Sequence, residues 1–116
     1  MCHVLIIEDE PVIADVLRCL LEDEGAATFD YADTEEAAVA AALSRPPDII
    51  TSDVKLASGT GPQAVSTIHE RLGEIPVIFI TATPGDCAPC SPPGRILRKP
   101  IDCDALAEAF HELAGA

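Results

Sequence analysis

The chain has 116 residues, of which 48% are hydrophobic, so its length and composition fit one domain with a buried core. Acidic residues outnumber basic ones by 20 to 7, which gives a formal net charge of -13. This balance argues against nucleic acids and anionic membranes as direct partners, because both are bound through clustered lysine and arginine. We therefore expect residues 1–116 to form a single domain that meets cationic surfaces or a bound cation.

The start of the chain lacks an export signal, because no basic segment precedes its first apolar run at 4–7. No apolar stretch approaches the roughly 20 residues that a membrane-spanning helix needs. The five cysteines are scattered along the sequence, and their odd number does not suit a disulfide scaffold. These features predict a cytoplasmic protein.

Short apolar runs alternate with longer segments of helical periodicity. The runs predict strands at 4–7, 27–31, 48–53, 76–81 and 96–97. The strand at 76–81 holds four apolar residues in a row, a pattern typical of a central parallel strand that is buried on both faces.

The segments between these strands carry recognisable helix ends. Pro11 suits the first position of a helix, and Gly25 would end that helix. Asp33 and Glu36 have the spacing of a capping box for the second helix. A third helix follows the turn at 59–62, and Asp102 would cap the last one.

One helix of the pattern is missing from the sequence. Residues 84–94 hold four prolines and two glycines, which no ordinary helix tolerates. The expected fold is therefore an α/β fold of five strand–helix units with a degenerate fourth helix. Such alternation predicts a doubly wound five-stranded parallel sheet with helices on both faces.

Polar residues follow the predicted strands at the sheet edge where function gathers in such folds. They are Glu8, Asp9, Asp53, Thr81 and Lys99. Clustered carboxylates repel one another, and Mg²⁺ is the natural remedy because it prefers oxygen ligands. One carboxylate could then attack a phosphoryl group, while the metal and Lys99 offset the charge on the phosphoryl oxygens and Thr81 donates a hydrogen bond.

These residues, in this order, resemble the receiver domain of two-component response regulators from Val4 to about Leu113. The matching positions are Glu8 and Asp9, Asp53, Gly61, Thr81 with Ala82, and Lys99 with Pro100. The resemblance implies a flavodoxin-like sheet of order 2-1-3-4-5. It also implies that Asp53 accepts a phosphoryl group from a histidine kinase or a histidine phosphotransfer protein, assisted by Thr81 and Lys99.

In the family, the metal is held by the second acidic residue, the acceptor and a backbone carbonyl two residues later. Here these are Asp9, Asp53 and the carbonyl of Lys55, and Glu8 would act through water. The implied cofactor is Mg²⁺, and the implied role is that of a switch, shuttle or phosphate sink without an output domain of its own. The protein would act on a possible downstream protein target, and it would not be an enzyme with an external substrate.

Two departures from the family pattern bear on signalling. Ile96 stands where the family has an aromatic switch residue, so the usual coupling between Thr81 and a ring cannot operate. The lost fourth helix removes part of the usual dimer face, and we expect a monomer. The segment ending in Arg98-Lys99-Pro100 is similar to that of a stand-alone subclass with a shortened region after the threonine.

Other functions compete with this interpretation. A pseudo-receiver would keep the fold and bind proteins without phosphorylation. An aspartyl-phosphate phosphohydrolase would need a second aspartate where this chain has Lys55. The pair Cys87 and Cys90 could instead form a redox disulfide, or half of a zinc site with Cys103 and His111. Lys55 could also tune the lifetime of the phosphoryl group, or it could be an ordinary solvated lysine.

Overall fold

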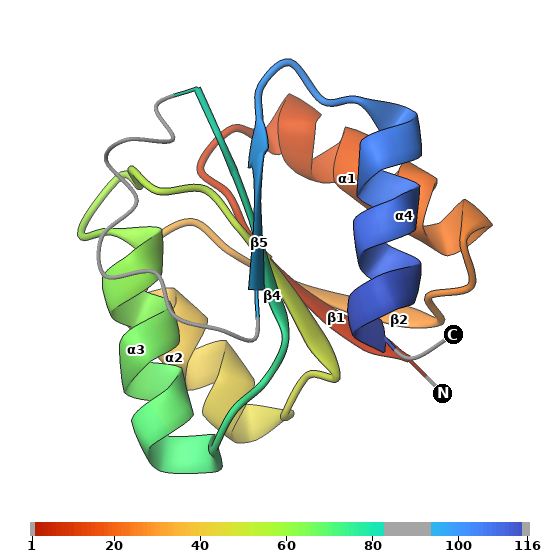
Figure 1. Cartoon of the computed structure of the whole chain (residues 1–116). Helices are drawn as coiled ribbons and strands as arrows, with labels where there is room; N and C mark the ends of the chain where they lie inside the picture. Colours follow the sequence, from red (N-terminus) through yellow and green to blue (C-terminus); the bar gives the residue numbers. More distant parts are fainter. Residues whose placement is uncertain (1, 83–93, 115–116) are drawn as a thin grey trace.

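A computed structural model describes residues 2–82 and 94–114 of the chain. Five strands form one parallel sheet in the order β2-β1-β3-β4-β5, which confirms the predicted fold class (Figure 1). The strands are β1 (His3–Ile7), β2 (Thr28–Ala32), β3 (Ile49–Ser52), β4 (Val77–Thr81) and β5 (Gly94–Arg98).

Helices cover both faces of this sheet. Figure 1 shows α2 and α3 on one face and α1 and α4 on the other. The helices are α1 (Pro11–Asp23), α2 (Glu35–Ser44), α3 (Gly61–Leu72) and α4 (Cys103–Ala114). The helix α4 follows β5 and is thus the last of the predicted helices. The proline-rich segment that we expect to replace an earlier helix lies almost entirely at 83–93, outside the described residues.

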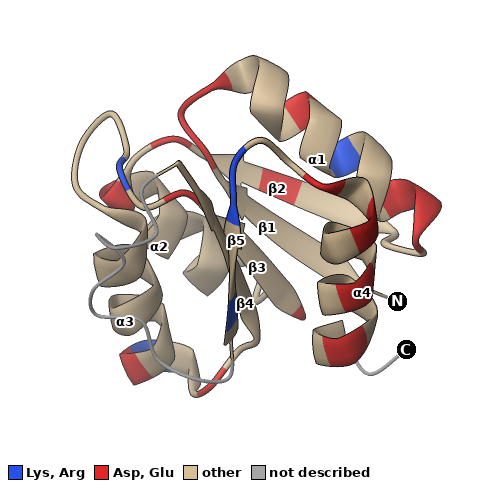
Figure 2. Ribbon diagram, turned by 45° about the horizontal axis from the view of Figure 1, so that its top comes forward, with Lys and Arg blue, Asp and Glu red and all other residues tan. Residues whose placement is uncertain are grey.

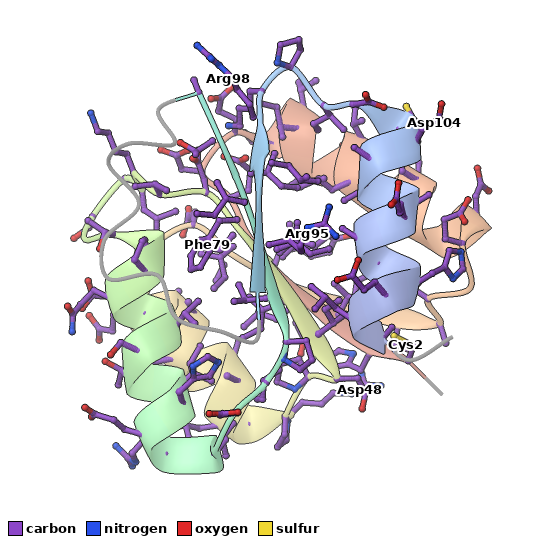
Figure 3. All side chains as sticks on the ribbon, viewed as in Figure 1. Cys2, Asp48, Phe79, Arg95, Arg98 and Asp104 are labelled. Atoms are coloured by element: carbon purple, nitrogen blue, oxygen red, sulfur yellow. The ribbon has the colours of Figure 1, made fainter. Side chains whose placement is uncertain are left out.

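The core consists of two apolar layers on either side of the sheet. Successive residues of a strand point to opposite faces, so Val4 and Ile6 pack toward α1 and α4 while Leu5 and Ile7 pack toward α2 and α3. Strands β1, β3 and β4 are buried along their whole length. Figure 3 shows the same division in strands β4 and β5, where Phe79 points to the α3 side and Arg95 to the α4 side.

Strand β5 forms one edge of the sheet and is only partly covered. Its exposure alternates along the strand, and Ile96 remains 46% exposed. The strand is longer than the sequence predicts, because β4 pairs with it from Gly94 to Arg98 rather than at two residues alone. An edge strand can keep polar side chains in solvent, so its full length is not marked by an apolar run.

Three helix ends agree with the sequence analysis and one does not. Pro11 begins α1, Gly25 follows its end with a φ of 111°, and the carboxylate of Asp102 accepts hydrogen bonds from the first turn of α4. The capping box of Asp33 and Glu36 is wrong. Thr34 caps α2 instead, and its hydroxyl accepts a hydrogen bond from the amide of Ala37 at 3.1 Å.

The strand register sets the position of the functional residues. Ile7 is level with Ser52 on the neighbouring strand, and Thr81 is level with Arg98. The residues that follow these strands therefore emerge side by side at the carboxyl ends of the strands.

Among residues 2–82 and 94–114, none of the helices has the length and apolar character of a membrane-spanning segment.

Candidate functional site

Four carboxylates converge where β1 and β3 end. Glu8, Asp9, Glu10 and Asp53 each place one carboxylate oxygen within 4.8 Å of the others. Three of these residues were predicted from the sequence, and Glu10 was missed. Its signal was present, because Glu10 continues the acidic run that begins at Glu8, but its role depends on how the chain turns into α1.

The ammonium group of Lys99 lies among these carboxylates. Its Nζ atom is 3.0 Å from Oδ2 of Asp53, 3.2 Å from Oε1 of Glu8 and 3.9 Å from Oε1 of Glu10. Burial lowers the pKa of Lys99, but hydrogen bonds to Asp53 and Glu8 outweigh that effect and leave the pKa raised. Lys99 is thus held in its charged form against the carboxylate of Asp53. Figure 2 shows acidic and basic segments meeting at this edge of the sheet.

Glu8 is the most deeply buried member of the group. Its side chain is 1% exposed, and its Oε2 atom accepts hydrogen bonds from the amides of Asp9 at 3.1 Å and Glu10 at 3.4 Å. Burial, followed by the negative charge of Asp53, raises the pKa of Glu8 to about 7, although Lys99 opposes the shift. Burial is thus the main reason why Glu8 holds its proton more strongly than an exposed glutamate does.

Asp53 faces a small cavity with both of its carboxylate oxygens engaged. The amide of Val54 donates to Oδ1 at 2.7 Å, and Lys99 donates to Oδ2 at 3.0 Å. The cavity has a volume of about 180 Å³, and its lining includes Glu10, Lys55, Thr81, Ala82 and Lys99. The structure thus brings the predicted residues Thr81 and Lys55 to the same cavity as the carboxylate of Asp53.

The start of α3 packs directly behind Asp53, and Gly61 allows this approach. A Cβ atom at residue 61 would lie 1.8 Å from the carbonyl oxygen of Asp53 and 2.2 Å from Oγ of Ser52. The hydroxyl of Ser52 donates to that same carbonyl oxygen at 2.8 Å. A side chain at residue 61 would therefore push against the backbone of Asp53, which is a steric reason for the glycine of the sequence motif.

The cysteine alternative receives no support from the described residues. Cys87 and Cys90 lie outside them. Cys103 is exposed, and the ring of His111 contacts the carboxylate of Glu24 at 2.6 Å. Over residues 2–82 and 94–114, the acidic group around Asp53 is the sole cluster of three or more potential metal ligands.

The parallel sheet, with its acidic group at the carboxyl ends of the strands, is typical of a receiver class of signalling domain, and comparison with known proteins supports this class. The family model for the response regulator receiver domain matches residues 4–111. The chain belongs to this family. Over 84 residues it is 45% identical to the phyllosphere-induced regulator PhyR of Methylorubrum extorquens, a match covering 71% of this chain and 31% of that protein.

Solved structures show the same fold. The solution structure of the PhyR receiver domain of Erythrobacter litoralis has a TM-score of 0.85 and 30% identity, covering 97% of this chain and 88% of that one. The receiver domain of the sensor histidine kinase PA1611 of Pseudomonas aeruginosa, solved with a coordinated magnesium ion, has a TM-score of 0.86 at 23% identity. That match covers 99% of this chain and 98% of that one. The chain spans about a third of the length of the curated relatives it matches.

Proposed function

We propose that this domain is a phospho-acceptor of a two-component phosphorelay and that Asp53 receives the phosphoryl group. The observation that carries the proposal is the contact of one carboxylate, Asp53, with Lys99 at the edge of a cavity that Thr81 and Lys55 also line. The donor would be a phosphohistidine of a histidine kinase or a histidine phosphotransfer protein.

The chemistry follows from the contacts of Asp53. One carboxylate oxygen attacks phosphorus, the phosphorus–nitrogen bond of phosphohistidine breaks, and an acyl phosphate forms. The amide of Val54 fixes one oxygen and so orients the other toward the cavity. Lys99 exchanges its contact with the carboxylate for one with a phosphoryl oxygen, and Thr81 donates a hydrogen bond to another, so both stabilise the charge that the transfer places there.

The residues present fit a magnesium site. Four carboxylates each place one oxygen within 4.8 Å of the others, and Lys99 is the ammonium group that contacts three of them. Asp9, Asp53 and the backbone carbonyl of Lys55 would hold Mg²⁺, and Glu8 would act through water. When bound, the ion supplies positive charge that offsets the carboxylates and the transferring phosphoryl group. The PA1611 receiver domain is a relative in fold that coordinates magnesium in its active-site cleft.

The domain would act as a switch, shuttle or phosphate sink rather than as an enzyme with an external substrate. Lys55 stands where a phosphohydrolase needs a second aspartate, so the acyl phosphate would be lost only by slow attack of water. We expect a cytoplasmic monomer whose output passes through contact with a downstream protein or through removal of phosphoryl groups from the relay.

A second candidate is a binding module that works without phosphorylation. Ile96, at 46% exposure on the edge strand, favours it, because the site has no ring at that position to follow Thr81 inward. The two candidates differ in whether Asp53 reacts.

The deciding experiment is intact mass spectrometry after incubation with phosphoramidate and Mg²⁺. We expect one phosphoryl adduct in the wild type, none in Asp53→Ala, and an unchanged adduct in Asp104→Ala, which removes an exposed carboxylate on α4. Chelation of Mg²⁺ should also abolish the adduct. A folded wild type that acquires no adduct would contradict the proposal and favour the binding module.

A further inference from the structure

The segment that follows Asp53 is held from outside by the first turn of α2. This segment, residues 54–60, is named the acceptor loop here. Its last four residues, 57–60, are exposed. The loop contains Lys55, whose backbone carbonyl belongs to the proposed magnesium site. Its conformation therefore depends on a small number of contacts rather than on burial.

Glu35, at the start of α2, makes two hydrogen bonds to this loop. One oxygen of its carboxylate accepts a hydrogen bond from the amide of Thr60 at 3.2 Å, and its own amide donates to the carbonyl of Ser58 at 3.0 Å. Gly59 makes this approach possible. Its φ is 77°, and a Cβ atom there would lie 2.5 Å from Cβ of Glu35.

Thr60 is connected to the proposed magnesium site through its backbone pairing with Lys55. Thr60 pairs with Lys55 in an isolated antiparallel bridge across the loop, and the amide of Gly61 donates to the carbonyl of Val54 at 2.8 Å. The beginning and the end of the loop are thus paired with each other through their backbones. The carboxylate of Glu35 binds the amide of Thr60, the residue that pairs with Lys55.

We propose that Glu35 is a positioning residue for magnesium binding, because it holds the acceptor loop in the form that presents the Lys55 carbonyl. It touches neither the acceptor nor the cavity, so its effect passes through the loop. This inference rests on the proposed function. Loss of the contact lowers the affinity for Mg²⁺ and leaves the phosphoryl-transfer chemistry at saturating Mg²⁺ unchanged.

Two conservative variants separate the hydrogen bond from the charge. Glu35→Asp keeps the negative charge in the first turn of α2 but is too short by one methylene group to reach the amide of Thr60. Glu35→Gln keeps the reach and an acceptor oxygen but removes the charge. Glu36→Ala is the matched control, since it removes an exposed carboxylate from the next residue of the same turn.

The first readout is the Mg²⁺ dissociation constant of the whole chain. It is measured from the changes in amide chemical shifts when Mg²⁺ is added without a phosphate donor. We expect Glu35→Asp to bind Mg²⁺ about fivefold more weakly, the effect of losing one ordinary hydrogen bond. Glu35→Gln and Glu36→Ala should stay within about twofold of the wild type. In the metal-free protein, the amide of Thr60 should exchange faster with solvent in Glu35→Asp alone.

The second readout is the rate of phosphorylation by phosphoramidate across a range of Mg²⁺ concentrations. Glu35→Asp should raise the half-saturating Mg²⁺ concentration by the same factor and reach the wild-type rate at saturation. Equal Mg²⁺ affinity in all variants would overturn the inference. So would weak binding by Glu35→Gln together with normal binding by Glu35→Asp, which would reveal a long-range charge effect. A wild type that binds no Mg²⁺ and gains no adduct would instead overturn the proposed function.

Discussion

The two ends of the parallel sheet treat their polar groups in opposite ways. At the amino ends of the strands, which lie near Cys2 and Asp48 in Figure 3, polar groups satisfy one another. His3 is 6% exposed, its ring bonds to Thr28 at 2.8 Å and Asp30 at 3.0 Å, and its amide donates to Asp48 at 2.7 Å. At the carboxyl ends, four carboxylates crowd together and Lys99 contacts three of them.

This difference separates stability from function within one fold. Paired polar groups lower the free energy of the folded state, whereas crowded like charges raise it and leave a site that gains from binding a cation. Variants at the amino ends should therefore change the free energy of unfolding and leave reactivity alone. Variants at the carboxyl ends should change both, and some of them should stabilise the protein.

The largest effect is expected for Gly61→Ala at the carboxyl ends. The added Cβ atom would lie 1.8 Å from the backbone oxygen of Asp53, so the start of α3 must shift. We expect the free energy of unfolding to fall by more than about 3 kcal/mol in urea denaturation. The control is Gly73→Ala, where the φ of 88° causes strain but no atom lies within 4 Å. With its ψ of -173°, the backbone of residue 73 is in a region that is essentially limited to glycine, so the cost of Gly73→Ala should be about 1–3 kcal/mol from backbone strain alone. A loss in Gly61→Ala no larger than the loss in Gly73→Ala would contradict the steric argument.

The next effect concerns the amino ends. His3→Leu removes two side-chain hydrogen bonds and leaves Thr28 and Asp30 without their ring partner. The free energy of unfolding should fall by about 2 kcal/mol. The rate of phosphorylation by phosphoramidate should not change, because the site lies at the opposite end of the sheet. A folded variant that reacts much more slowly would show that the two ends are coupled.

Glu8→Gln should stabilise the protein when no divalent cation is present. The pKa of Glu8 rises from its ordinary value of 4.5 to about 7 on folding, so folded molecules bind more protons than unfolded ones between these values. The wild type therefore loses stability as the pH rises through this window, and a glutamine does not. At pH 8 in a chelator, the variant should be more stable by on the order of 1–2 kcal/mol.

The same comparison at pH 5 is the control for Glu8→Gln. Glu8 is largely protonated there, so the gain should shrink. Addition of Mg²⁺ at pH 8 should favour the wild type over the variant. If the variant is less stable than the wild type at pH 8 without metal, the contact of Glu8 with Lys99 outweighs the crowding.

The smallest effect is expected for Thr51→Val in the middle of β3. The hydroxyl of Thr51 is buried and has no hydrogen-bond partner among the residues that the structure describes. Its replacement by a methyl group should raise the free energy of unfolding by less than about 1 kcal/mol. Ser52→Ala is the contrasting variant, since its hydroxyl donates to the carbonyl of Asp53 and its loss should destabilise. A gain in both variants would contradict this distinction.

The strands and the residues at their carboxyl ends could be predicted from the sequence, because they depend on short patterns of apolar and polar residues. Strands β1, β3 and β4 contain clear apolar runs, and parallel alternation with helices brings the carboxyl ends of the strands together. That rule alone places Glu8, Asp53, Thr81 and Lys99 together. The edge strand β5 was only partly visible, because Arg95 and Arg98 pair with β4 through their backbones while their side chains face solvent or α4.

The sequence did not reveal contacts in which either of two neighbouring residues could take part. Thr34 caps α2 in place of Asp33, because the chain direction at the end of β2 sets which side chain faces the free amides. Likewise, the contact of Glu35 with Thr60 joins residues 25 positions apart, and no periodicity records it. Such pairings follow from tertiary packing, and no local pattern in the sequence indicates them.

The placement of Lys99 has a consequence for the timing of synthesis. Asp53 leaves the ribosome early, but its ammonium partner comes from the end of the last strand, beyond β4 and β5 in the chain. A nascent chain that has not yet added residue 99 therefore carries Asp53 without the ammonium group that contacts it. If Asp53 accepts phosphoryl groups as proposed, we expect such chains to react poorly with phosphate donors until β5 has joined the sheet.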